Sequence, residues 1–108
     1  MPRKNLNPKA VPTLIQDRLR IWGLAIKKQR TLQRIRAADL SQRMEISEAT
    51  LRRLERGDPG AGAALYLAAL QILGALDELA PMPPKELWLP DTKQRVRLPQ
   101  KVIEGDYF

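Results

Sequence analysis

Two adjacent arginines, Arg52 and Arg53, are the side chains of this sequence with the clearest chemical use. A guanidinium group can donate two parallel hydrogen bonds to O6 and N7 of guanine, the commonest specific contact between a protein and DNA. The apolar residues Ile46, Leu51 and Leu54 surround the pair at spacings that suit one side of a short helix. The pattern therefore predicts a helix with an apolar inner side and an outer side that offers arginine to base edges.

The sequence lacks most of the residue types and motifs that are typical of catalytic sites. It contains no histidine and no cysteine, so the usual general base, the commonest metal ligand and disulfide bonds are all missing. A glycine-rich phosphate loop and a pair of carboxylates suited to acid and base catalysis are also absent from the sequence pattern. We therefore expect no enzymatic activity, no cofactor and no metal ion.

Positive charge is concentrated in the half of the chain that contains these arginines. The net charge of +7 divides into +7 for residues 1–30, +2 for residues 31–57 and −2 for residues 58–108. A basic half attracts polyanions, although basic small domains are common for other reasons. The absence of cysteine suits a reducing compartment, and the interrupted apolar stretch 61–76 predicts no membrane span, so we expect a cytoplasmic protein.

Five helices are expected between residues 13 and 80. A helix should begin after Ser47, whose hydroxyl can cap it, and end at Gly57; another should span about 36–44. Residues 62–73 and 75–80 predict two more, with Gly74 between them. The first helix should start near Thr13, which has capping-box spacing to Gln16, and its apolar side should carry the core residues Ile15, Leu19, Trp22 and Ile26. Gly23 within that helix predicts a close contact between helices.

The two ends of the chain have a different character, which predicts three regions. Residues 1–12 form a basic arm, in which Arg3, Lys4 and Lys9 either follow DNA or are simply solvated. Residues 13–80 form the helical domain. Proline stops helical structure at residue 81, and residues 81–108 are either a disordered tail or an interaction segment, with extended-looking stretches at 86–89 and 95–98 that are compatible with a small β-hairpin.

The segment 22–79 resembles the lambda-repressor-like, or Xre-type, helix-turn-helix family. The matching stretches are Trp22–Lys27 with Arg30, Leu40–Met44 with Ile46 and Ser47, Thr50–Gly57, and Leu70–Gly74 followed by Leu76–Leu79. The resemblance implies an all-α fold, a five-helix domain whose third helix enters the DNA major groove. The chain departs from the family in having Glu45 where glycine is usual in the turn, and Arg36 and Ala37 where Thr and Gln are common.

The resemblance also implies which side chains face DNA. The expected base contacts, whose alternative is a solvated polar surface, are Ser47, Glu48, Ala49, Arg52 and Arg53. The expected phosphate contacts, which set position and affinity rather than sequence preference, are Lys27, Lys28, Arg30, Arg34, Arg36, Arg43 and Thr50. Proteins of this type bind palindromic double-stranded operators as homodimers, and the expected dimer or partner contacts lie in the fifth helix and at Leu87, Trp88, Tyr107 and Phe108.

A narrower resemblance concerns Leu54–Gly60 with Tyr66–Leu70 and Leu73–Leu76, which look like the HipB-type antitoxins, closest to HipB of the tripartite HipBST systems. It implies an antitoxin that represses its own operon and binds a HipA-type serine/threonine kinase, with a small third subunit in the tripartite systems. The alternatives are a stand-alone Xre-type repressor without a toxin and, in another class, an adaptor that binds only protein.

Overall fold

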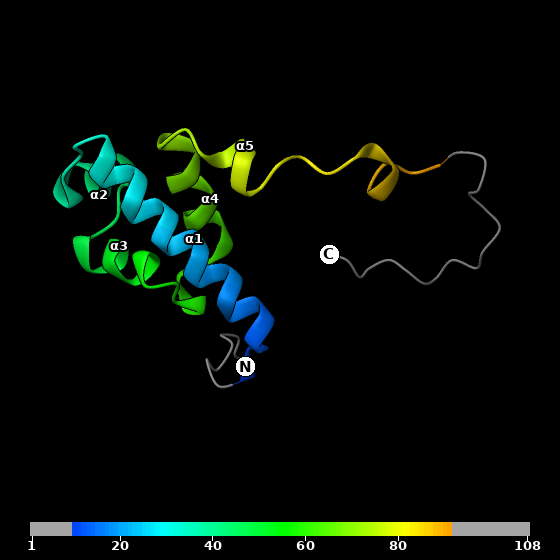
Figure 1. Ribbon diagram of the computed structural model, residues 1–108, viewed down its shortest axis with the longest axis horizontal. Coiled ribbons are helices and arrows are strands. Elements are labelled where there is room, and N and C mark those ends of the chain that lie inside the picture. The colour runs from blue at the N-terminus through cyan, green and yellow to red at the C-terminus, as the bar shows by residue number, and fades with distance from the viewer. Residues whose placement is uncertain (1–9, 92–108) are drawn as a thin grey trace.

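The structure, a computed structural model, describes residues 10–91 as a cluster of helices followed by a projecting segment (Figure 1). The helices are α1 (Thr13–Leu32), α2 (Ala37–Met44), α3 (Glu48–Glu55), α4 (Ala63–Ile72) and α5 (Leu76–Leu79), with short 3₁₀ turns η2 (Pro59–Ala61) and η3 (Lys85–Leu87). Within residues 10–91 there is no strand, in agreement with the expected all-α class.

The helices begin and end within a residue or two of the predicted positions, but the first helix starts differently in detail. Thr13 is the first helical residue rather than the cap, and Pro12 occupies the preceding position without a side-chain hydrogen bond. The side-chain amide nitrogen of Gln16 donates to the carbonyl oxygen of Val11 at 2.8 Å. The predicted capping box is therefore wrong, because the residue that would have to cap the helix lies inside it.

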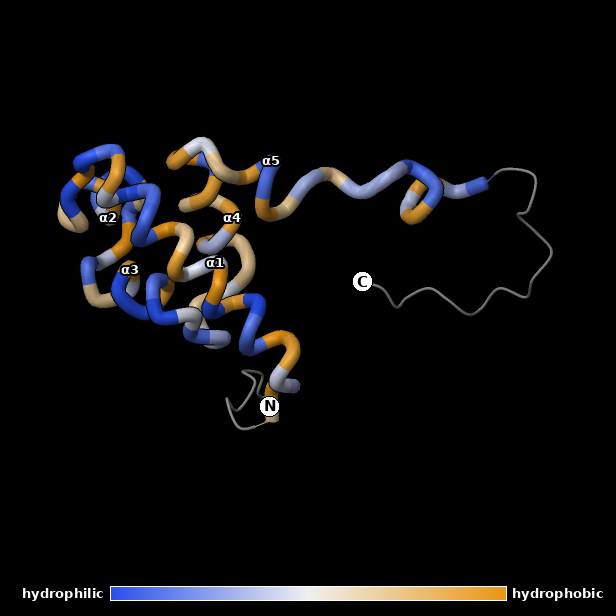
Figure 2. The backbone as a smooth tube through the Cα atoms, in the orientation of Figure 1, coloured by the Kyte–Doolittle hydropathy of each residue, from blue (hydrophilic) through white to orange (hydrophobic). Residues whose placement is uncertain are grey.

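One side of each longer helix contributes to a shared core. Its fully buried side chains are Ile26, Leu40, Leu51, Leu54, Tyr66 and Leu70. Figure 2 shows that hydrophobic residues dominate α4 and hydrophilic ones dominate α3. Helix α4 nevertheless buries one side, with Tyr66, Ala69 and Leu70, and leaves Leu67 and Gln71 exposed on the other, and α3 likewise keeps one side in contact with solvent.

The apolar side of α1 meets this core only from Leu19 onward. Leu19 and Trp22 pack against the core, and the Trp22 ring lies 6.0 Å from the Tyr66 ring. Trp22 is therefore a packing residue, as expected. Ile15, predicted to be a core residue, is exposed, because it lies in the first turn of α1 before the stretch that packs against the core.

Two glycines allow α1 and α3 to touch backbone to backbone. A Cβ atom on Gly23 would lie 2.5 Å from the carbonyl oxygen of Leu54, and one on Gly57 would lie 2.6 Å from the Cα of Arg20. Gly57 also has a φ of +80°, which suits the residue after a helix end. The close helix contact predicted from Gly23 is confirmed, and it fixes α3 against α1 without an intervening layer of side chains.

The chain leaves the helical cluster after α5 and points away from it (Figure 1). Residues 86–89, predicted to be extended, instead continue the turn η3, in which the amides of Trp88 and Leu89 donate to the carbonyl oxygen of Lys85. Pro84 starts this turn with a φ of −61°, and the described residues provide no neighbouring strand to pair with. The other half of the predicted hairpin lies outside the described residues.

Candidate nucleic-acid interface

A three-residue turn sets the angle between α2 and α3. Glu45 adopts the left-handed conformation with a φ of +59°, and its amide donates to the carbonyl oxygen of Gln42. The amide of Ile46 donates to the carbonyl oxygen of Ser41 at 3.0 Å, and the Ile46 side chain packs against the core. The turn is thus held by backbone hydrogen bonds and by one apolar anchor.

Ser47 caps α3 as the sequence predicts. Its hydroxyl oxygen accepts a hydrogen bond from the amide of Thr50 at 3.0 Å and donates one to the Thr50 hydroxyl at 3.0 Å. The cap satisfies an amide that would otherwise have no partner in the first turn. Both hydroxyls lie at the surface. The Thr50 hydroxyl accepts the hydrogen bond from Ser47, so this contact does not use the hydrogen of the Thr50 hydroxyl.

The outer side of α3 is a small surface with an excess of positive charge, since it carries Arg52 and Arg56 against Glu48. Leu51 and Leu54 point into the core, whereas Ala49, Arg52 and Arg56 are exposed. Ala49 is short, so the backbone of the first turn can approach a ligand closely. Arg56, which was not among the predicted contacts, follows Ala49 and Arg52 at helical spacing, and that spacing could have identified it from the sequence.

Arg52 is held only weakly. One of its terminal nitrogens lies 3.9 Å from a carboxylate oxygen of Glu48, and both side chains are about half exposed. An exposed pair at this distance contributes little to stability, so the guanidinium is available to another partner. Arg52 also lines a hollow between α1 and α3, together with Leu24, Lys27, Glu55 and Arg56.

Arg53 is held more firmly, by Asp58 in the connection to α4. Its Nε donates to Asp58 at 2.9 Å, and a second oxygen of Asp58 accepts from the amide of Gly60 at 2.8 Å. These two contacts, that of Arg53 first, lower the pKa of Asp58 below its usual value. The Tyr66 hydroxyl donates to the carbonyl oxygen of Asp58, and burial raises the pKa of Tyr66 to about 12.

The predicted phosphate contacts do not all lie on the surface around α3. Lys27 lines the hollow beside Arg52 and also, with Lys28, Thr31 and Leu32, a second depression along α1, whereas Lys28 lines the second depression but not the hollow. Arg34 and Arg43 are exposed. Arg36 is exposed at the start of α2 and pairs with Asp39 at 3.1 Å, a contact that lowers the pKa of Asp39.

Arg30, predicted to contact phosphate, belongs instead to the interior. Its Nε and one terminal nitrogen donate to the two carboxylate oxygens of Glu55 at 2.8 and 3.2 Å, and the other donates to the carbonyl oxygen of Ile35 at 3.1 Å. The Arg30 and Glu55 side chains are only 14% and 8% exposed. The hydrogen bond that Arg30 donates to Glu55 raises the pKa of Arg30. The predicted phosphate contact is thus replaced by an ion pair that joins α1, α3 and the start of α2.

The predicted partner contacts at the C-terminal end are only partly described. Leu87 and Trp88 are exposed on the projecting segment. Tyr107, Phe108, Arg3, Lys4 and Lys9 lie outside the described residues.

Within residues 10–91, no cluster of His, Cys, Asp or Glu side chains is suited to a metal ion. None of the described helices has the length and hydropathy needed to cross a membrane. Comparison with protein-family models, curated proteins and solved structures gave no match to this chain.

Proposed function

We propose that the chain is a sequence-specific DNA-binding protein of the helix-turn-helix type. In this proposal α2 and α3 form the helix-turn-helix, and α3 enters the major groove of the DNA. The observation that carries the proposal is the exposed side of α3, where Ala49, Arg52 and Arg56 face solvent while Leu51 and Leu54 face the core.

Arg52 is the first candidate for a base contact in this arrangement. Its weak contact with Glu48 can be exchanged for two hydrogen bonds to guanine. Glu48 can accept from the amino group of cytosine, and the methyl group of Ala49 can contact the methyl group of thymine. Arg53 would have to weaken its contact with Asp58 to reach a base, so we assign it to a base edge or a phosphate at the margin of the surface.

Phosphate binding is assigned to the exposed cations around α3. Lys27 and Arg56 lie beside Arg52. Arg36 lies at the start of α2, and Arg43 lies in its last turn. The start of α2 approaches the DNA backbone in helix-turn-helix proteins, because the first helix of the motif crosses that backbone. These contacts would provide affinity and orientation, and base contacts would provide sequence preference.

The biological setting that we propose is an autorepressing antitoxin. A homodimer would bind a palindromic operator, with one α3 in each half-site. The resemblance of Leu54–Gly60 and Tyr66–Leu76 to HipB-type antitoxins supports a HipA-type kinase, with or without a small third subunit, as a further partner. The exposed apolar side chains of residues 82–89 would suit a contact with another protein chain in such an assembly. Co-purification of the chain with the products of neighbouring genes tests the kinase assignment, and failure to recover a kinase would favour the stand-alone repressor.

The DNA-binding proposal is tested by selecting bound duplexes from a randomised pool and comparing variants on the selected and a scrambled duplex. Arg52→Ala should weaken binding to the selected duplex by roughly 1–3 kcal/mol and binding to the scrambled duplex much less. Arg20→Ala is the matched control, because it removes an exposed arginine that lies on α1 rather than on α3. It should leave the preference for the selected duplex over the scrambled duplex intact. Equal losses on both duplexes would assign Arg52 to phosphate. Failure to enrich any sequence would favour the protein-binding adaptor.

A further inference from the structure

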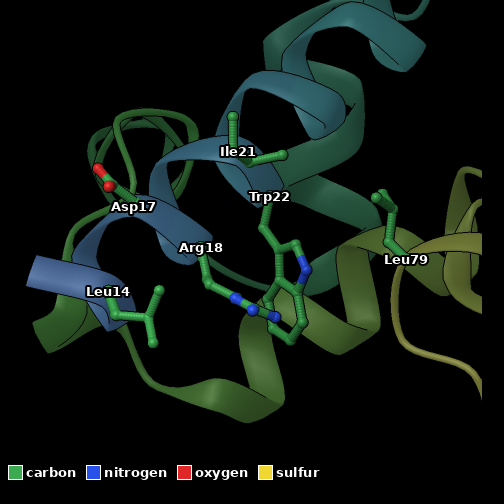
Figure 3. A pocket seen from close by; sticks show the side chains of 6 residues that line it. All are labelled: Leu14, Asp17, Arg18, Ile21, Trp22 and Leu79. Atoms are coloured by element: carbon green, nitrogen blue, oxygen red, sulfur yellow. The ribbon is translucent and has the colours of Figure 1, made fainter.

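The outer face of α1, opposite its contact with α3, carries apolar side chains that nothing in the described chain covers. Leu14 and Leu32 are 65% and 64% exposed, and Ile21 lies between them on the same side of the helix, while Leu24, at the edge of this face, borders the hollow that Arg52 lines. Near its N-terminal end this face is hollowed into a groove of about 330 Å³, lined by Leu14, Asp17, Arg18, Ile21, Trp22 and Leu79 (Figure 3). A groove of this size can accept one large apolar side chain with its neighbours.

A second uncovered apolar surface lies on the projecting segment 82–89, here called the arm. Met82 and Leu87 are 79% and 75% exposed, and Trp88 and Leu89 are each about half exposed. The indole nitrogen of Trp88 donates to the carbonyl oxygen of Pro83 at 3.0 Å. The polar atom of the indole is therefore satisfied within the arm, and the ring can enter an apolar groove without leaving an unpaired donor.

The proline-rich segment 81–84, which includes the start of the arm, keeps the two surfaces of one chain apart. Pro81, Pro83 and Pro84 lie in it, and Pro84 has the extended φ and ψ values of −61° and 147°. Proline-rich segments behave as stiff spacers of about 3.1 Å per residue, so residues 81–84 hold the rest of the arm, residues 85–89, roughly 12 Å from the end of α5. Figure 1 shows the arm pointing away from the helices. The groove begins at Leu79, immediately before this spacer, so folding back would require a sharp reversal within the prolines.

We propose that the α1 groove of each chain takes the arm of a second copy of the same chain, with Trp88 in the groove and Leu87 and Leu89 against the neighbouring apolar face of α1. The exchange is reciprocal, because every copy carries one arm and one groove, and it closes as a two-fold dimer. Charge is compatible with the pairing, since the arm carries one cation and one anion, Lys85 and Glu86, and the groove is lined by one of each, Asp17 and Arg18, so each charge can meet its opposite. This inference rests on the homodimer of the proposed function, for which it supplies the contact surface.

Sedimentation of the full chain without DNA tests the exchange. Trp88→Ala and Ile21→Glu should each raise the dimer dissociation constant by about tenfold or more, because each removes apolar contact from both halves of the dimer. Leu67→Ser, which alters an exposed leucine on α4, is the matched control and should leave the dissociation constant unchanged.

An equimolar mixture of the two variants separates arm exchange from other dimers. The Ile21→Glu chain keeps its arm and the Trp88→Ala chain keeps its groove, so the mixture should regain one contact and form more dimer than either variant alone. Packing of two α1 faces against each other would leave Trp88→Ala as dimeric as the wild type, and that result would overturn the proposal.

Single cysteines locate the contact directly, because the chain contains none of its own. Leu87→Cys mixed with Ile21→Cys should form a disulfide-linked heterodimer on air oxidation, whereas Leu87→Cys mixed with Gln71→Cys, an exposed position on α4, should not. A chain carrying both Leu87→Cys and Ile21→Cys should link between chains. A disulfide within one chain, or a protein that stays monomeric, would overturn the proposed exchange. If such a monomer still selected a DNA half-site, the DNA-binding proposal would stand.

Discussion

Arg30 and Glu55 join α1 to α3 through a nearly buried, two-point ion pair. Arg30→Ala would leave the Glu55 carboxylate with little solvent and without its partner. We expect this variant to lower the free energy of unfolding by roughly 3 kcal/mol, because an uncompensated buried charge is far more costly than a missing pair. Urea denaturation followed by circular dichroism measures the change.

Two further variants make that measurement specific. Arg30→Met combined with Glu55→Gln removes both charges and should be more stable than Arg30→Ala alone. Arg36→Ala breaks the exposed pair with Asp39 and should have a much smaller effect than Arg30→Ala. If Arg30→Ala lowered the free energy of unfolding as little as Arg36→Ala, the Arg30–Glu55 pair would not be needed to hold α3 against α1.

Asp58 links the pH dependence of stability to the connection after α3. Arg53 and the amide of Gly60 hold its pKa below the usual value of 3.8. A carboxyl group of this kind stabilises the folded chain above its unfolded pKa, and the contribution is lost as the pH falls through the folded pKa. Thermal unfolding should therefore show a loss of stability from about pH 4 downward that is smaller in Asp58→Asn. Asp17→Asn, on the exposed side of α1, controls for the removal of one carboxylate. Equal acid sensitivity of Asp58→Asn and the wild type would contradict this.

Single residues were predictable where their partners are close in sequence. Ser47 was identified as a cap because its partner, the amide of Thr50, is three residues away. Arg30 was misassigned because Glu55 lies 25 residues further along, and no local pattern indicates that the two meet. The pairing of Arg53 with Asp58 spans a helix end and was missed for the same reason.

At the level of elements, the turn before α3 carries local strain at Glu45. A residue with a side chain is disfavoured in the left-handed region, whereas glycine adopts it freely. Glu45→Gly should raise the free energy of unfolding by about 0.5–1 kcal/mol, the relief of strain being partly offset by the greater freedom of glycine in the unfolded chain. Glu45→Ala keeps the Cβ atom and should give no such gain in thermal denaturation. Stabilisation by both variants would assign the effect to the lost negative charge.

Helix positions were largely predictable from apolar spacing and from Gly57 and Gly74, since these signals are local. Periodicity failed at the ends of the domain. Ile15 continues the apolar pattern of α1 beyond the helices that could cover it, and the pattern of residues 86–89 does not distinguish a strand from a short turn. In both cases the outcome depends on whether a neighbouring element is present, which spacing alone does not indicate.

For the molecule as a whole, the uneven positive charge predicts DNA binding that weakens with salt. Each cation that contacts phosphate releases counterions and adds about one to the slope of log affinity against log salt concentration. Lys27→Ala should reduce this slope by about one, because Lys27 lies beside Arg52. Lys28→Ala should reduce it less, because Lys28 does not line the hollow that contains Arg52. The reverse ranking in mobility-shift titrations would place a different side of α1 against the DNA.

The direct backbone contact of α1 with α3 has a consequence for how the molecule opens. At Gly23 and Gly57 no side chain can rearrange to keep the contact while the helices separate, so small outward displacements lose it at once. Amide hydrogens near this crossing should therefore exchange with solvent deuterium only in events that expose the core as a unit. Those of η3, which has no buried residue, should exchange through local fluctuations at low cost. We therefore expect α3, the helix that we assign to DNA, to open more slowly than η3.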